Sequence, residues 1–215
     1  MKLDRILTYT ATAVALAFAA PAGATIIGGG VSSINQSFVK LPVPFAISTP
    51  DNTVGSDNFN LDVLFGFDED QNVSVTGAPL VSNVPSTSLP VGTVVASHYV
   101  FYDPLSGVID GYVEFDAPIL AIMTDTAELA ASDYLANTGV TYLSPGARGL
   151  EPGDTATIDS GDPNRVLIHL AASTPGDYIR VLTAFSPAAA AVPAPGTLAL
   201  IGPGLAALGF ARRRR

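Results

Sequence analysis

The sequence predicts a mainly β protein, an antiparallel β-sandwich of jelly-roll type with one short helix, flanked by an N-terminal signal helix and a C-terminal hydrophobic helix. Short apolar segments with a period of two recur through the middle of the chain. The 215 residues include 20 glycines and 17 prolines, which favour many turns and short strands. This length suits one domain plus targeting segments.

Strand-like segments follow one another from residue 59 onward. In 59–67 apolar residues occupy every second position, and in 108–115 Val113 and Phe115 would face one side while Glu114 faces the other. Such alternation is typical of an antiparallel sheet with one face in water. The other expected strands are 72–76, 92–102, 118–123, 140–143, 165–171 and 178–185.

One helix is expected within 124–139. Thr124 or Asp125 would serve as its N-cap, and Asn137 or Gly139 would end it. We expect this helix to cover an open edge or end of the sandwich. The side chains expected to lie against the sheet are Leu129 and Tyr134.

Residues 1–24 have the pattern of a secretory signal peptide. Two basic residues precede an apolar run over 6–20, and Ala22 and Ala24 form the small-x-small cleavage signature. Thr25 would be the first residue of the mature chain, and the secretory translocon and signal peptidase are the implied partners. The alternative is an uncleaved anchor, for which the run is short.

The C-terminal end has the pattern of a membrane anchor. Residues 197–211 carry no charge, although a comfortable span needs roughly 20 residues. Arg212, Arg213, Arg214 and Arg215 would form a basic cytoplasmic tail that stops transfer. The alternative is a core helix with a solvated basic end, to which four arginines would add no packing.

A short motif precedes this anchor, within the linker 187–196. Val192, Pro193, Ala194 and Pro195, followed by an apolar span and terminal arginines, resemble the PEP-CTERM sorting signal. That family usually has Glu where this chain has Ala194. The resemblance implies a Gram-negative host, processing by exosortase near Pro195, and transient anchoring in the inner membrane. It also implies a role around extracellular polysaccharide or biofilm.

The segment between the two ends is strongly acidic. Residues 25–191 contain 18 acidic and four basic residues, a formal charge of −14. Such a surface repels phosphate backbones, so nucleic acid is not expected as a partner. The chain has no cysteine, which excludes a disulfide framework, a cysteine-ligated metal and a thiol nucleophile. We expect residues 25–186 to form the secreted acidic domain.

Catalytic signatures are scarce, and we expect no enzyme. His98 and His169, the two histidines, both fall in strand-like segments. Glu114 and Asp116 would lie on one strand face about 7 Å apart, which could serve a carboxylate pair. They leave open the alternative of a secreted glycan hydrolase that uses Glu114 and Asp116.

Two loops are dense in oxygen ligands and are candidates for a calcium cofactor. Calcium takes six to eight oxygens, and neither loop has EF-hand spacing. The alternative is that both are solvated turns, which Asn and Asp favour for backbone reasons. The candidate ligands are Asp68, Glu69 and Asp70 in the first loop and Asp159 and Asp162 in the second.

Four aromatic residues, Tyr99, Phe101, Tyr102 and Tyr112, occur in two successive strand-like segments. They could form a platform for sugar rings, although core packing is the more frequent use. Alternation would place Tyr99 and Phe101 together and Tyr102 on the other face with His98.

The function expected from these observations is non-catalytic. The chain would be an exported surface or extracellular-matrix protein with a structural or adhesive role. The alternatives are an extracellular glycan-binding module, assisted by calcium or not, and the hydrolase described above.

Overall fold

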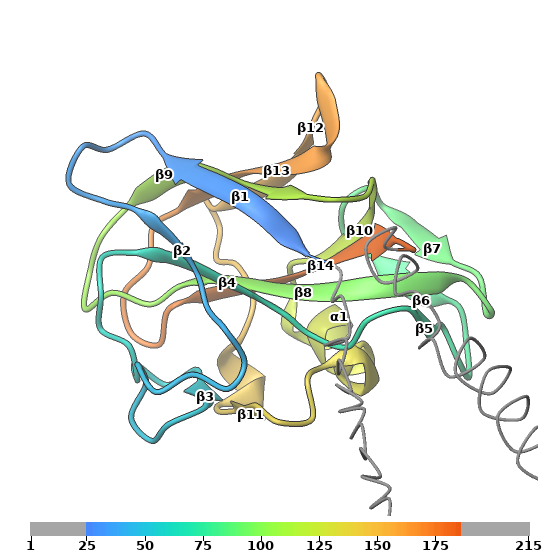
Figure 1. Cartoon of the computed structure of the whole chain (residues 1–215), viewed down its shortest axis with the longest axis horizontal. Coiled ribbons are helices and arrows are strands. Elements are labelled where there is room, and N and C mark those ends of the chain that lie inside the picture. The colour runs from blue at the N-terminus through green and yellow to red at the C-terminus, as the bar shows by residue number, and fades with distance from the viewer. Residues whose placement is uncertain (1–24, 186–215) are drawn as a thin grey trace, which may run out of the picture. The chain divides into compact units, whose positions relative to one another are not determined.

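The computed structural model describes residues 25–185, which form several β-sheets and one α-helix (Figure 1). This confirms the prediction of a mainly β protein with one short helix. The expected signal helix and C-terminal hydrophobic helix lie outside the described residues.

The elements of residues 25–185 are mostly short strands. In chain order the strands are β1 (Ile26–Val31), β2 (Phe38–Lys40), β3 (Thr53–Val54), β4 (Leu64–Asp68), β5 (Val73–Ser74), β6 (Leu80–Ser82), β7 (Thr87–Leu89), β8 (Val94–Tyr102), β9 (Ile109–Phe115), β10 (Ile119–Met123), β11 (Thr141–Tyr142), β12 (Thr155–Asp159), β13 (Asp162–Leu170) and β14 (Asp177–Ala184). The helical elements are α1 (Thr126–Ala131) and two 3-10 turns, η1 (Asp133–Leu135) and η2 (Pro145–Ala147).

Two larger sheets organise these strands. The first has four antiparallel strands in the order β1-β9-β13-β12. The second has six strands, with the path β10-β14-β8-β4-β2 and with β5 paired to β8. Most neighbours are antiparallel as expected, but β2 runs parallel to β4 and β11 runs parallel to β3.

The two larger sheets share one buried apolar cluster. Strand β9 alternates as predicted, because Val113 and Phe115 are fully buried while Tyr112 and Glu114 are partly exposed. Opposite them lie residues of the six-stranded sheet, so the side chains of both sheets fill one core. Its members include Ile109, Val113, Val166 and Ile168 from the four-stranded sheet and Val100, Tyr102, Ile179 and Val181 from the six-stranded sheet.

The six-stranded sheet is buried on its other face as well. Its aromatic side chains pack there against loops and against α1, which lie on the side away from the four-stranded sheet (Figure 1). The expectation of one face in water is therefore wrong for β8 and β14, where only Val94 is exposed and Ala184 is partly exposed. This second cluster joins Phe65, Phe67, Tyr99, Phe101 and Tyr178 of the sheet to Phe45, Phe59, Leu129, Leu135 and Val140 of the covering layer.

The helix is shorter than predicted and covers a sheet face rather than an edge. Asp125 is its N-cap, as one of the two expected residues, but α1 ends at Ala131 and the chain continues as η1. Ser132 Oγ donates to the carbonyls of Glu128 and Leu129 at this break. The break changes the helical register, so Leu135 is buried and Tyr134 is 42% exposed, against expectation.

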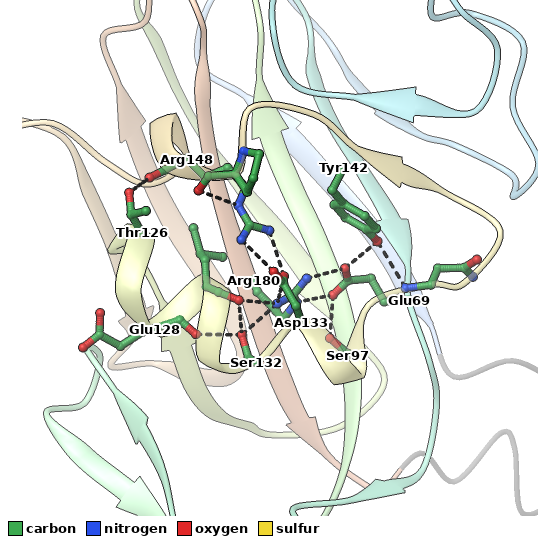
Figure 2. A network of polar contacts seen from close by, with 12 residues as sticks. Glu69, Ser97, Thr126, Glu128, Ser132, Asp133, Tyr142, Arg148 and Arg180 are labelled. Carbon is green, nitrogen blue, oxygen red and sulfur yellow. Dashed lines mark hydrogen bonds and ion pairs between the residues drawn. The ribbon is translucent and has the colours of Figure 1, made fainter.

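Arg180 of β14, in a buried ion pair with Glu69, also fastens this covering layer to the sheet (Figure 2). Arg180 is fully buried, and its Nε and Nη2 donate to the two carboxylate oxygens of Glu69 at 2.6 and 2.9 Å. Its Nη1 donates to the Leu129 carbonyl at 3.0 Å and to Ser132 Oγ at 2.7 Å. Burial alone would lower the pKa of Arg180, but Glu69 raises it, so Arg180 stays charged.

A second pair completes the network. Arg148 donates from Nη1 and Nη2 to the two oxygens of Asp133, each at 2.8 Å. Glu69 accepts two further bonds, from the hydroxyls of Ser97 and Tyr142 at 2.6 Å each. Figure 2 shows these side chains converging beside α1, where two cations balance two carboxylates. Satisfied in this way, the charges can be buried without large cost.

The replacement Glu69→Gln should lower the free energy of unfolding by about 3–5 kcal/mol, because the buried Arg180 would lose its buried carboxylate partner and keep only the partly exposed Asp133, 3.2 Å from its Nη1. Denaturant unfolding of the full chain measures this loss. Glu114→Gln is the control, because it breaks a partly exposed ion pair and should cost about 1 kcal/mol or less. Equal losses in the two variants would contradict the role of the buried pair.

Candidate functional site

The outer surface of the four-stranded sheet, called here the open sheet face, gathers polar and aromatic side chains that the core does not use. The pairing register sets them in rows, with Glu114 opposite Arg165, Tyr112 opposite Leu167 and Asp110 opposite His169. Its outward side chains are Asp110, Tyr112 and Glu114 of β9, Arg165, Leu167 and His169 of β13, and Thr155 and Thr157 of β12.

Tyr112 and Arg165 form the centre of the open sheet face. The guanidinium carbon of Arg165 lies 4.9 Å from the centre of the Tyr112 ring, within the range of a cation–π contact. A Cβ at Gly30 of the neighbouring strand would lie 2.9 Å from the ring, so the ring extends over a position where only glycine fits. The ring therefore lies on the sheet surface instead of projecting from it.

One residue pair of the open sheet face carries acid–base groups. The Nδ1 of His169 lies 2.7 Å from Asp110 Oδ1, and both side chains are substantially exposed. Thr155 of the edge strand is the cross-strand neighbour of His169. The row can exchange hydrogen bonds with a ligand, because it offers a hydroxyl, an imidazole and a carboxylate side by side.

The residues of the hydrolase hypothesis lie at one end of β9. Arg165 Nη2 and Nε both donate to Glu114 Oε1, at 2.5 and 3.1 Å. Asp116 lies beside Thr25, whose carbonyl accepts from the Asp116 amide at 3.1 Å. The carboxylate of Glu114 is thus engaged by a cation of its own chain.

The three acids of the first candidate calcium loop, Asp68, Glu69 and Asp70, lie in different surroundings. Asp68 Oδ2 lies 2.7 Å from Lys40 Nζ, whereas Glu69 is buried against Arg180. Burial and the neighbouring Glu69 raise the pKa of Asp70. The loop therefore does not direct its three carboxylates at one point.

The second calcium loop surrounds a cation side chain. Asp159 Oδ2 and Asp162 Oδ2 lie 3.3 and 3.7 Å from the guanidinium nitrogens of Arg165, which also binds Glu114. Within residues 25–185, no three Asp, Glu, His or Cys side chains are placed to share a metal ion. A calcium site at these loops stays a prediction.

His98 takes part in a contact that sequence reasoning did not find. Its Nδ1 lies 2.8 Å from Asp68 Oδ1 and its Nε2 lies 3.2 Å from Thr183 Oγ1, the order of a catalytic triad. Thr183 and His98 are fully buried between the sheets, with no surface where a substrate could meet the hydroxyl. The trio therefore connects β4, β8 and β14 inside the core.

Three of the four aromatic residues proposed as a platform are core residues. Tyr99 and Phe101 lie together in one cluster and Tyr102 lies on the opposite face with His98, as predicted. All three are 0–1% exposed. Tyr112 alone of the four faces outward, because β9 belongs to the other sheet.

Two acids that the sequence did not single out are buried without a cation. Asp103 and Asp177 are 0% and 3% exposed, and each has one carboxylate oxygen with no hydrogen-bond partner. Burial raises the pKa of Asp103 to about 6, with Asp57 adding to the shift. Burial, with Asp154 and Glu151, raises the pKa of Asp177 to about 7.

Several expectations concern residues beyond the described range. They are the signal cleavage residues Ala22 and Ala24, the sorting motif 192–195, the span 197–211 and the tail 212–215. Among residues 25–185, no helix is long and apolar enough to cross a membrane. Comparison with protein-family models, curated proteins and solved structures gives no match.

Because of Asp103 and Asp177, we expect the free energy of unfolding to decrease as the pH rises. Because their pKa values of about 6 and about 7 exceed the unfolded value of 3.8, the folded chain binds more protons than the unfolded chain between those values. This stabilisation is complete below about pH 4 and is lost as the pH rises through 6 to 7. The thermal midpoint of the full chain, measured with a chelator present, should therefore be higher at about pH 5.5 than at about pH 8.

Two variants isolate Asp177 in this measurement. Asp177→Asn should raise the midpoint at about pH 8 and reduce its dependence on pH, because the buried charge is removed. Asp51→Asn, which changes an exposed acid, should leave the pH dependence as it is. The same pH dependence in Asp177→Asn and in the unchanged chain would contradict the interpretation.

Proposed function

We propose that this chain is an exported surface or extracellular-matrix protein with a non-catalytic, structural or adhesive role. The observation that carries the proposal is the three-part C-terminal segment: the motif 192–195, the apolar stretch 197–211 and the arginines 212–215. Its resemblance to the PEP-CTERM signal implies sorting by exosortase and release outside the cell. The signal-like residues 1–24 support the same route.

The proposed body of the protein is a jelly-roll-like β-sandwich within 25–186. Successive strands alternate between the two larger sheets, since β8 and β10 belong to one and β9 to the other. The same alternation occurs from β13 to β14. Such crossings, together with the shared apolar cluster, are typical of double-sheet folds built from Greek keys.

The state of the reactive side chains favours a non-catalytic role. Glu114 is held by Arg165, and Thr183 is fully buried beside His98. A nucleophile or a general acid must reach its substrate, and these groups face their own chain. This supports the structural role over the glycan hydrolase.

Glycan binding at the open sheet face is the second candidate function. The observation that favours it is the placement of Tyr112, a ring lying on the sheet surface with Arg165 against it. Sugar rings bind to such rings through their apolar faces while their hydroxyls bond to surrounding polar groups. Asp110, His169 and Thr155 supply such groups in the neighbouring row.

The intact mass of the protein from its native host tests the sorting proposal. We expect a chain that begins at Thr25 and ends near Pro195, and that end should be lost in a host without exosortase. The cleaved ends are the two positions that the targeting patterns specify. A mass that still contains Arg212 to Arg215 in both hosts would contradict release by exosortase.

Tyr112→Ala tests the second candidate function. Loss of ring stacking should weaken binding to polysaccharide from the host matrix by about two- to ten-fold, as measured by affinity electrophoresis. Tyr134→Ala is the control, because Tyr134 is an exposed tyrosine of the covering layer, remote from the open sheet face. Equal binding by both variants and the unchanged chain would exclude the platform.

A further inference from the structure

Two loops enclose a small hollow beside the start of β14. One loop follows η2 and contains Gly149 and Glu151, and the other is the turn that ends in Gly176 and Asp177. The hollow has a volume of about 230 Å³, and side chains of both loops line it. Segments separated by some 25 residues in sequence therefore face one another across a space large enough for an ion and water.

Asp177 lines this hollow and has a buried carboxylate oxygen without a hydrogen-bond partner. The residue is 3% exposed, and its Oδ2 is buried with no hydrogen-bond partner. A buried carboxylate without a partner is costly, and proteins resolve that cost with a proton, a cationic side chain or a bound cation.

No cationic side chain of the described residues resolves it. Arg148 also lines the hollow, but both of its terminal nitrogens are 2.8 Å from the oxygens of Asp133. The other charges that act on Asp177 are negative, from Glu151 and Asp154. The charges around Asp177 are therefore negative, and Arg148, the cation that lines the hollow, is already paired with Asp133.

The neighbouring acids are fixed in place by the backbone. Asp154 Oδ2 accepts from the Glu151 amide at 3.0 Å, and its Oδ1 accepts from the Ala171 amide at 2.8 Å. These bonds hold the 151–154 turn, so Glu151 stays at the rim of the hollow. Glu151 and Asp177 therefore line the hollow from its two loops, close enough for Glu151 to act on the charge of Asp177.

We propose that the hollow binds a divalent cation of the calcium class, with Asp177 and Glu151 as its carboxylate ligands. Calcium takes six to eight oxygens and accepts backbone carbonyls and water, which the two loops and the open side of the hollow can supply. Carbonyls and water would have to complete the shell, because the described residues place no group of three acidic side chains there. Neither residue belongs to the loops 68–70 and 159–162 that the sequence suggested.

The cation would join the loop after η2 to the first residue of β14. Arg148, which is part of the buried network, lines the same hollow. Binding would therefore stabilise the covering layer, and the stabilisation would add to the free energy of unfolding by mass action.

Calcium titration of the full-length protein tests the proposal. After chelator treatment, at about pH 8 and in about 0.15 M NaCl, we expect calcium chloride to bind with one equivalent by calorimetry. The thermal midpoint should rise by several degrees at saturating calcium. Magnesium chloride should raise it less, because magnesium demands a stricter octahedral shell and dehydrates reluctantly.

Variants of single side chains assign the site. Asp177→Asn and Glu151→Gln should each reduce the calcium-dependent rise by more than half. Asp177→Asn removes an unpaired buried charge, so it should fold without calcium and keep the experiment interpretable. Asp51→Asn, an exposed acid in another loop, is the matched control and should retain the full rise.

Two results would overturn the proposal. One is an unchanged thermal midpoint of the unaltered protein up to about 10 mM calcium, which exceeds the range of weak extracellular sites. The other is a full calcium response in both Asp177→Asn and Glu151→Gln, which would place the ion elsewhere.

Discussion

Arg180 and Glu69 meet on the face of the six-stranded sheet that α1 and the loops cover, and the attachment of that covering layer depends on Arg180. A sheet covered on one side by a second sheet and on the other by loops needs something to fix the loops. Apolar contact is not directional, whereas the fork of Arg180 sets the position of Glu69, Leu129 and Ser132 together. The ion pair therefore gives the covering layer its register on the sheet.

Basic residues are scarce in this domain, and each of them forms an ion pair with an acidic side chain. Residues 25–191 contain four, and each is paired: Lys40 with Asp68, Arg148 with Asp133, Arg165 with Glu114 and Arg180 with Glu69. Two pairs support the covering layer, one lies at the sheet edge near β1, and one crosses the open sheet face. Asp103 and Asp177 are the buried acids for which no such partner is left.

The sequence predicted several local features, but it did not predict that the six-stranded sheet is covered on both faces. The alternation in β9 and the choice of Thr124 or Asp125 as N-cap could be predicted directly, because each depends on neighbours in the chain. Strand β1 could not, since its three glycines are poor strand formers and only pairing with β9 makes it extended. The Asp68–His98–Thr183 contact could not be predicted either, because it joins three segments that are distant in the sequence. Arg180 lies inside the apolar run 178–185, and a charged residue in such a run indicates that it is buried with a partner of opposite charge.

The pairing of the four basic side chains within residues 25–185 has a consequence for many copies of this domain together. Because the four cations are consumed by contacts within the domain, little positive charge is left on its outside to attract another copy. Crowded domains would repel one another over about 10 Å at 0.1 M salt, and more weakly as the salt increases. A layer made of such domains would swell in fresh water and contract in brine, with dissolved ions setting the spacing between molecules.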